Sequence, residues 1–158
     1  MNNEEIFMRE ALKEAKKAYG KLEIPVGAII VKDGKIISRG YNQKEGKKDS
    51  TRHAEIIAIQ KACKKLNSWR LLDCEMYVTL EPCSMCAGAI IQSRINKIFI
   101  GTMDEKTGSA GSVLNLFKDY KFNHNVDVEY GVCKDECEKI IKDFFKELRS
   151  TKKKSNYK

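Results

Sequence analysis

Residues Thr79-Leu80-Glu81-Pro82-Cys83-Ser84-Met85-Cys86 mark the passage from a strand to a helix and place two cysteines there. The short apolar run that ends at Leu80 predicts a strand over 75–80. Pro82 has no amide hydrogen and suits the first turn of a helix, so we predict a helix over 83–93. Two cysteines separated by two residues at a helix start can turn toward one point, where free amides favour thiolates.

A second chemical motif, His53-Ala54-Glu55, stands at the start of a helix predicted over 54–66. Zinc binds thiolates and neutral imidazoles, and a catalytic zinc site with three protein ligands keeps a position open for water. We therefore predict that His53, Cys83 and Cys86 bind Zn²⁺. Glu55 is not needed as a zinc ligand, and we predict that it is the catalytic residue that transfers protons. The order H-x-E followed by P-C-x-x-C is the known signature of zinc deaminases.

The remaining four of the six cysteines have a simpler interpretation. Cys63 falls in a helical pattern and Cys74 just before a strand, and both are expected to be small core residues. Cys133 and Cys137 lie about one helical turn apart and offer a second metal site as an alternative. No histidine or further cysteine is near them in the sequence, which argues against that alternative.

The length and the net charge of the chain limit its domain number and the kind of partner that it binds. The chain has 158 residues, 42% of them hydrophobic, which predicts a single domain over 1–150 and a basic flexible tail over 151–158. A net charge of +8 favours a polyanionic partner such as nucleic acid, although it could serve solubility alone. The first residues are polar, and no apolar run has the length of a membrane span, so we expect no membrane and a cytoplasmic location.

The order of the predicted elements indicates the fold class. Strands alternate with helices after an opening hairpin whose turn is Asp33-Gly34. The predicted helices cover 4–19, 54–66, 83–93 and 135–149; the strands cover 26–31, 35–41, 75–80, 97–101 and 126–130; loops cover 46–51 and 102–112. This order predicts an α/β fold, a three-layer α/β/α sandwich around a five-stranded mixed sheet.

From about Phe7 to Leu148 the chain resembles the bacterial tRNA-specific adenosine deaminases of the cytidine deaminase-like superfamily. The matching stretches are 24–28, 40–42, 53–55, 80–90, 93–95, 104–112 and 123–124. The zinc motif is common to the whole superfamily. The loop at 106–112, Lys-Thr-Gly-Ser-Ala-Gly-Ser, and the pair Asn123-His124 are more specific to the tRNA enzymes.

The resemblance implies a homodimer that converts adenosine to inosine at the wobble position of a tRNA anticodon stem-loop, typically in an arginine tRNA. It also implies roles for further residues: Asn42 at the flipped nucleoside, Pro25, Ala54 and the Leu80-Glu81 pair lining the pocket, Asp104 at the preceding nucleotide, and Asn123 with His124 at the loop. Four of these residues have a plainer alternative. Asn42 could form a turn, Asp104 could be a surface acid, His124 could simply be solvated, and Glu81 could serve local hydrogen bonds.

Two rival functions share part of this pattern. A deaminase of a free base or nucleoside, of the guanine or cytosine type, would need the zinc motif but neither the +8 charge nor the loop over 104–112. A zinc-stabilised RNA-binding module without catalysis would explain the charge and the cysteines, but not Glu55.

Arg52 departs from the small residue that is more common in the family at this position.

Overall fold

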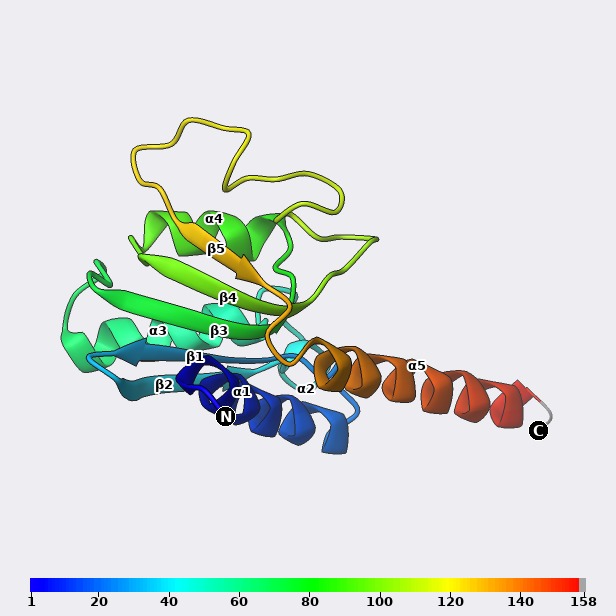
Figure 1. Cartoon of the computed structure of the whole chain (residues 1–158). Helices are drawn as coiled ribbons and strands as arrows, with labels where there is room; N and C mark the ends of the chain where they lie inside the picture. The colour runs from blue at the N-terminus through cyan, green and yellow to red at the C-terminus, as the bar shows by residue number, and fades with distance from the viewer. Residues whose placement is uncertain (157–158) are drawn as a thin grey trace.

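A five-stranded mixed sheet between two layers of helices carries the fold (Figure 1). The computed structural model describes the backbone of residues 1–156 and the side chains of residues 1–151. The helices are α1 (Asn3–Gly20), α2 (Lys44–Lys47), α3 (Ala54–Leu66), α4 (Ser84–Gln92) and α5 (Lys134–Asn156). The strands are β1 (Gly27–Lys32), β2 (Lys35–Tyr41), β3 (Cys74–Leu80), β4 (Lys97–Thr102) and β5 (Asp127–Tyr130).

The strand order is β2-β1-β3-β4-β5. β1 runs antiparallel to both β2 and β3, whereas β3, β4 and β5 are parallel, so the predicted mixed sheet is confirmed. Asp33 and Gly34 close the β1–β2 hairpin with φ angles of 51° and 74°. Positive φ at both central residues is the geometry that an Asp-Gly hairpin turn adopts.

Alternation along the central strands separates two cores. Ile29, Tyr77 and Phe99 face one side, where they pack with residues of α1 and with Cys137 of α5. Tyr77 and Phe99 stack with ring centroids 4.2 Å apart. The neighbouring strand residues, among them Ile30 and Val78, face the other side and pack against α3 and α4. The three-layer sandwich predicted from the sequence is therefore confirmed.

A close approach between β2 and α3 sets the position of the helix that carries Glu55. A Cβ added at Gly40 would lie 2.4 Å from the Ala54 carbonyl oxygen and 2.9 Å from the Ala58 amide nitrogen. Ser38, on the same face of β2, donates a hydrogen bond to the Ala58 carbonyl over 2.8 Å. Helix α3 therefore begins directly against the strand, with no side chain between them.

Gly40→Ala is expected to lower the free energy of unfolding by about 1–3 kcal/mol, the usual cost of overpacking. The added methyl group meets backbone atoms, which cannot move without shifting α3. Chemical denaturation measures the effect, with Gly20→Ala as the matched control because a Cβ at Gly20 meets nothing within 4 Å. Equal stability of the two variants would show that the β2–α3 approach is not constrained.

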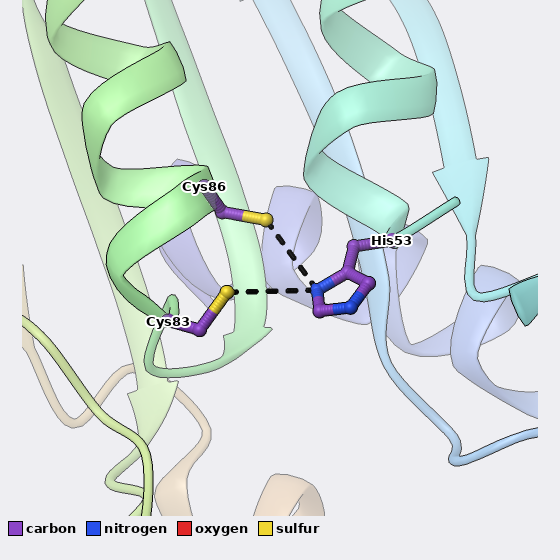
Figure 2. A group of neighbouring side chains, drawn as sticks. All are labelled: His53, Cys83 and Cys86. Carbon is purple, nitrogen blue, oxygen red and sulfur yellow. Dashed lines mark hydrogen bonds between the residues drawn. The ribbon is translucent and has the colours of Figure 1, made fainter. Parts of the chain in front are cut away.

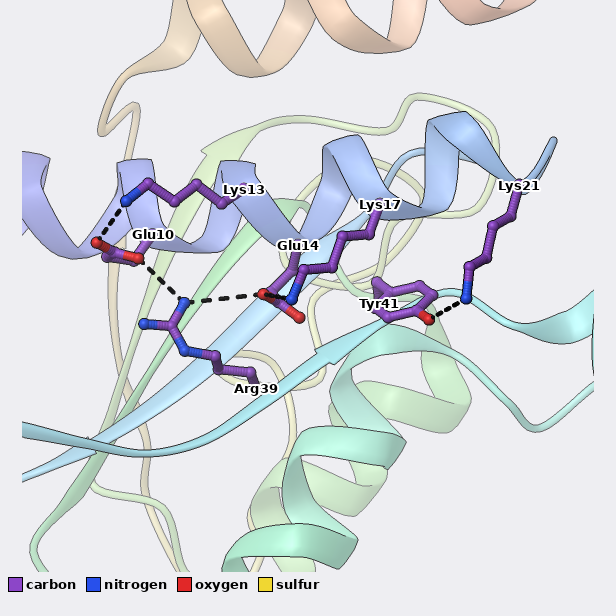
Figure 3. Close-up of polar contacts among 7 residues, drawn as sticks. All are labelled: Glu10, Lys13, Glu14, Lys17, Lys21, Arg39 and Tyr41. Atoms are coloured by element: carbon purple, nitrogen blue, oxygen red, sulfur yellow. Dashed lines mark hydrogen bonds and ion pairs between the residues drawn. The ribbon is translucent and has the colours of Figure 1, made fainter.

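Ion pairs fix the other side of β2 to α1 (Figure 3). The Arg39 guanidinium lies 3.0 Å from the Glu10 carboxylate and 3.7 Å from that of Glu14. Lys13 and Lys17 pair with the same two acids along α1. Hydrogen bonds from Lys13 and Arg39 lower the pKa of Glu10, and the first of these has the larger effect. The basic partners in these pairs are partly or largely exposed, so each pair contributes little to the stability of the fold.

Two expectations about the elements need correction at their edges. Residues 46–51 were predicted as a loop, but α2 occupies Lys44–Lys47, so the first two of them are helical and 48–51 are irregular as predicted. The carboxylate of Glu23 accepts hydrogen bonds from the amides of Glu45 and Gly46. The closing helix was predicted to end at Arg149, but α5 continues to Asn156. The predicted flexible tail therefore begins inside a helix, where the Thr151 hydroxyl bonds the Glu147 carbonyl; residues 157 and 158 lie outside the described part. Lysine is a good helix former, which favours the continuation.

Within the described residues, no helix combines the length and the apolar character needed to cross a membrane.

Candidate metal centre

Helices α3 and α4 begin side by side on one face of the sheet and bring His53, Cys83 and Cys86 together (Figure 2). His53 and Cys83 are the residues that immediately precede the two helices, and both have extended backbone conformations. Cys86 follows in the first turn of α4 and is fully buried. The two helix starts predicted from the sequence thus converge on one point.

The distances in this cluster suit a tetrahedral zinc ion. The Nδ1 atom of His53 lies 3.7 Å from the sulfur of Cys83 and 3.5 Å from the sulfur of Cys86. Zn–S and Zn–N bonds of ordinary length at a tetrahedral angle place sulfur and nitrogen about 3.6 Å apart. Within the described residues this is the one group of three or more metal-binding side chains whose ligand atoms all lie within 4.8 Å of one another. One imidazole and two thiols are also a donor set that zinc prefers.

Hydrogen bonds favour the thiolate form of Cys83. The hydrogen bond from Cys86, helped by one from His53, lowers the pKa of Cys83 to about 4. The same contact with Cys83, together with burial, raises the pKa of Cys86. The hydrogen bond to Cys83 raises the pKa of His53. The hydrogen bonds therefore favour a thiolate at Cys83, and metal binding would have to displace the proton of the Cys86 thiol.

Glu55 is a buried carboxylic acid next to this cluster. Its side chain is only 3% exposed, and burial raises its pKa to about 7, with a smaller contribution from Cys83. A carboxyl group with a pKa near neutrality can both accept and release a proton. It lies outside the group of three potential ligands. This environment suits the proton-transfer role that the sequence predicts.

Asn42 links Ala54, the residue after His53, to Ile24, the residue before Pro25. Its side-chain oxygen accepts a hydrogen bond from the Ala54 amide over 2.8 Å, and its amide group donates to the Ile24 carbonyl over 3.1 Å. Pro25 and Ala54 are both buried. The turn-forming role of Asn42 is therefore present. One N–H of its side chain and one lone pair are still free for a substrate, which keeps the predicted contact open.

Asp104 follows β4 and reaches the metal end of the molecule through Glu81. The Asp104 amide donates to the carboxylate of Glu81 over 2.9 Å, and Glu81 is two residues from Cys83. The Asp104 side chain bonds the amide of Lys106 and the hydroxyl of Thr107, at 3.1 and 2.7 Å. The hydrogen-bonding role predicted for Glu81 is confirmed, but its partners are 23 to 31 positions away in the sequence and not local. The sequence did not predict which residues bond Glu81. An acidic residue between an apolar strand and a proline carries no signal for its partners.

Asn123 and His124 lie at the opposite end of α4 from the cysteines. The Nε2 atom of His124 is 2.7 Å from the carbonyl oxygen of Ile95, which follows α4. Asn123 lines a pocket of about 180 Å³ together with Arg94 and Phe122. The nine residues of α4 span about 13 Å at the helical rise of 1.5 Å per residue. Within one chain, the structure does not bring this pair to the metal centre.

The other cysteines occupy packing positions. Cys74 is fully buried in the α3–α4 core, where Cys63 packs at its margin. Cys137 is also fully buried and lies against Gly101, whose added Cβ would come within 2.4 Å of its sulfur. Cys133 donates to the Glu5 carbonyl. Among the described residues no third ligand joins Cys133 and Cys137, which favours their role as core residues.

The fold and this cluster together define a protein of the cytidine deaminase-like class. A family model described as MafB19-like deaminase matches residues 1–149. The tRNA-specific adenosine deaminase of Bacillus subtilis (strain 168) is 47% identical over 153 residues, which cover 97% of this chain and 95% of that protein. The chain belongs to the family of tRNA-specific adenosine deaminases.

Solved structures agree with this assignment. A structure from a study of A-to-I editing by tRNA:A34 deaminases at the wobble position of transfer RNA has a TM-score of 0.83 and 41% identity, covering 85% of this chain and 98% of that chain. A guanine deaminase from Bacillus subtilis is less similar, with a TM-score of 0.62 and 32% identity, covering 78% of this chain and 88% of that chain. The comparison therefore favours the tRNA enzymes over the free-base enzymes.

Proposed function

We propose that this protein deaminates adenosine to inosine at the wobble position of a tRNA anticodon, with zinc held by His53, Cys83 and Cys86. The observation that carries the proposal is the cluster of one imidazole and two thiols beside the buried carboxyl group of Glu55. When bound, zinc acts as a Lewis acid that activates water as a nucleophile near neutral pH. A closed structural site would need a fourth protein ligand, whereas this cluster offers three.

The residues around the metal have separate tasks in this proposal. Glu55 takes a proton from the attacking water and delivers it to the ring nitrogen. It then carries the second proton of that water, from the hydroxyl formed on the ring carbon, to the departing amine. Asn42 uses the donor and the lone pair that its backbone contacts leave free to hold the flipped nucleoside. Ala54, whose amide bonds Asn42, and Pro25, which follows the Ile24 carbonyl that Asn42 also bonds, form the pocket wall.

An anticodon loop is a suitable substrate for such a buried site. A base inside a duplex cannot reach the metal without being unpaired and unstacked, whereas the bases of a loop are already single-stranded. The net charge of +8 complements the phosphate backbone that surrounds the target. Asp104, which lies beside the metal centre through Glu81, contacts the nucleotide before the target.

We further propose that the protein is a cytoplasmic homodimer and that an arginine tRNA is its substrate. In one chain, Asn123 and His124 lie at the far end of α4 from the metal. A second subunit offers a route by which these residues could reach an RNA bound at its partner's site. Sedimentation of the free protein tests the dimer, and sequencing of inosine sites in the tRNA pool identifies the substrate.

The two rivals explain less of the site. A free-base deaminase accounts for the metal cluster and Glu55, but it gives no role to the charge or to Asp104. A non-catalytic zinc module accounts for the charge and the cluster, but it leaves a buried carboxyl group with a raised pKa next to the ligands without a function.

Ammonia release tests these alternatives directly. We expect the kcat/KM for adenosine within an anticodon stem-loop to exceed that for free adenosine, cytidine or guanine by at least about a hundredfold, because contacts to flanking nucleotides orient the reacting base. A stem-loop carrying cytidine at the target position is the matched control. Comparable turnover of any free base or nucleoside would favour the free-base rival, and no turnover of any substrate would favour the zinc module.

A further inference from the structure

Glu81 is a buried carboxylate between the end of β3 and Cys83, and its side chain is 2% exposed. Its Oε1 atom accepts hydrogen bonds from the Asp104 amide, at 2.9 Å, and from the Ser112 hydroxyl. Its Oε2 atom accepts from the amides of Ala110 and Ser112, at 2.9 and 3.0 Å. A carboxylate has about four acceptor positions, so donors from one loop occupy all of them.

These donors come from both ends of the loop over 104–112, which folds back around the carboxylate. The Ser109 amide adds a bond of 2.8 Å to the carbonyl of Pro82, the residue before Cys83. Gly108 packs so closely that an added Cβ would lie 2.2 Å from the carboxyl carbon of Glu81. The loop backbone is therefore built around a charged group, and its conformation depends on that group.

The position of Asp104 follows from this arrangement. Its backbone amide is held by Glu81, while its own carboxylate is held by Lys106 and Thr107 within the loop. We propose that Glu81 is a positioning residue for the RNA substrate: its carboxylate holds the 104–112 loop, and Asp104 with it, beside the metal centre. The inference rests on the proposed function, in which Asp104 contacts the nucleotide before the target.

Glu81→Gln is the discriminating variant because it keeps the shape of the side chain. It replaces one carboxylate oxygen, which offers two acceptor positions, with an NH₂ group, which offers two donors. Its NH₂ group would face backbone N–H groups, so part of the hydrogen-bond set is lost in a buried place. We expect the KM for the stem-loop to rise about tenfold while kcat changes less than about threefold, the pattern of a lost binding contribution. Zinc content should stay at one per chain. Hydrogen exchange at the amides of Asp104, Ala110 and Ser112 should become faster.

Glu14→Gln is the matched control, since Glu14 is equally buried, at 3% exposed, but lies on α1 at the other face of the sheet. It should leave KM and loop exchange as in the wild type. Ser112→Ala removes a single donor and keeps the carboxylate. It serves if Glu81→Gln fails to fold, with an expected rise in KM of about twofold to threefold.

An unchanged KM in Glu81→Gln, or in Ser112→Ala if that variant replaces it, would overturn the positioning role. So would a loss of activity that disappears once it is normalised to zinc content, because that pattern indicates a damaged metal centre. Failure of the proposed function looks different: the wild-type protein itself would not deaminate the stem-loop. The exchange measurement still separates the cases, since it reports the hold of Glu81 on the loop without any substrate.

Discussion

Glu55→Gln is expected to lower turnover of the stem-loop by about a hundredfold to ten-thousandfold, the range typical of general acid–base groups. The variant protein should still fold and keep its metal. The amide has nearly the same shape as the carboxyl group but cannot take a proton from water and return it to the base. Because Glu55 would act in several proton transfers, the loss should lie toward the upper end of this range. Single-turnover deamination at saturating RNA measures the step itself.

Zinc content and stability are the two control measurements for Glu55→Gln. Zinc content should remain at one per chain, because Glu55 is outside the group of three potential ligands. Stability should not suffer, since burial disfavours the charged form of this carboxyl group and a neutral amide avoids that cost. An active Glu55→Gln enzyme, or one that loses its metal, would contradict the proton-transfer role.

The main elements could be predicted from the sequence because their patterns are local. The strand ending at Leu80, the proline after it and the cysteines beyond it appear in the structure as β3 followed by α4. The Asp33-Gly34 turn likewise depends on the two residues themselves. The convergence of His53, Cys83 and Cys86 was predictable for a related reason, since each stands at a helix start that the sequence marks.

The differences arise where structure depends on distant partners. In α2, the amides of Glu45 and Gly46 donate to Glu23, more than twenty positions earlier, a contact that no local pattern shows. The partners of Glu81 are likewise 23 to 31 positions away. The sequence indicated that Glu81 forms hydrogen bonds, but which loop it holds follows only from the tertiary structure.

The substrate contacts divide in the same way. Asn42 is bonded to Ala54, so its place beside His53 follows from the motif that begins at His53. His124 sits at the end of a long connection between β4 and β5, and its bond to Ile95 fixes it at the far end of α4. The resemblance gave both residues a role in substrate binding. The structure places only Asn42 near the chemistry of its own chain.

Cys86→Ala is expected to abolish both zinc binding and deamination, and to lower the temperature of unfolding. Two remaining ligands cannot hold zinc as three do, and the free energy of metal binding is part of the free energy of folding. For zinc present at about a thousand times its dissociation constant, that contribution is about 4 kcal/mol. Cys74→Ala is the matched control: Cys74 is also fully buried, but it packs in the core away from the cluster.

Metal analysis and thermal unfolding with and without a chelator separate a lost ligand from a lost core contact. The chelator should lower the unfolding temperature of the wild type and of Cys74→Ala, because both are expected to hold zinc in the folded state. It should have no effect on Cys86→Ala, whose unfolding temperature should already match that of the chelated wild type apart from the cost of the missing sulfur. Full zinc occupancy in Cys86→Ala would mean that the metal is held by other atoms. The convergence of α3 and α4 on His53, Cys83 and Cys86 would then need another explanation.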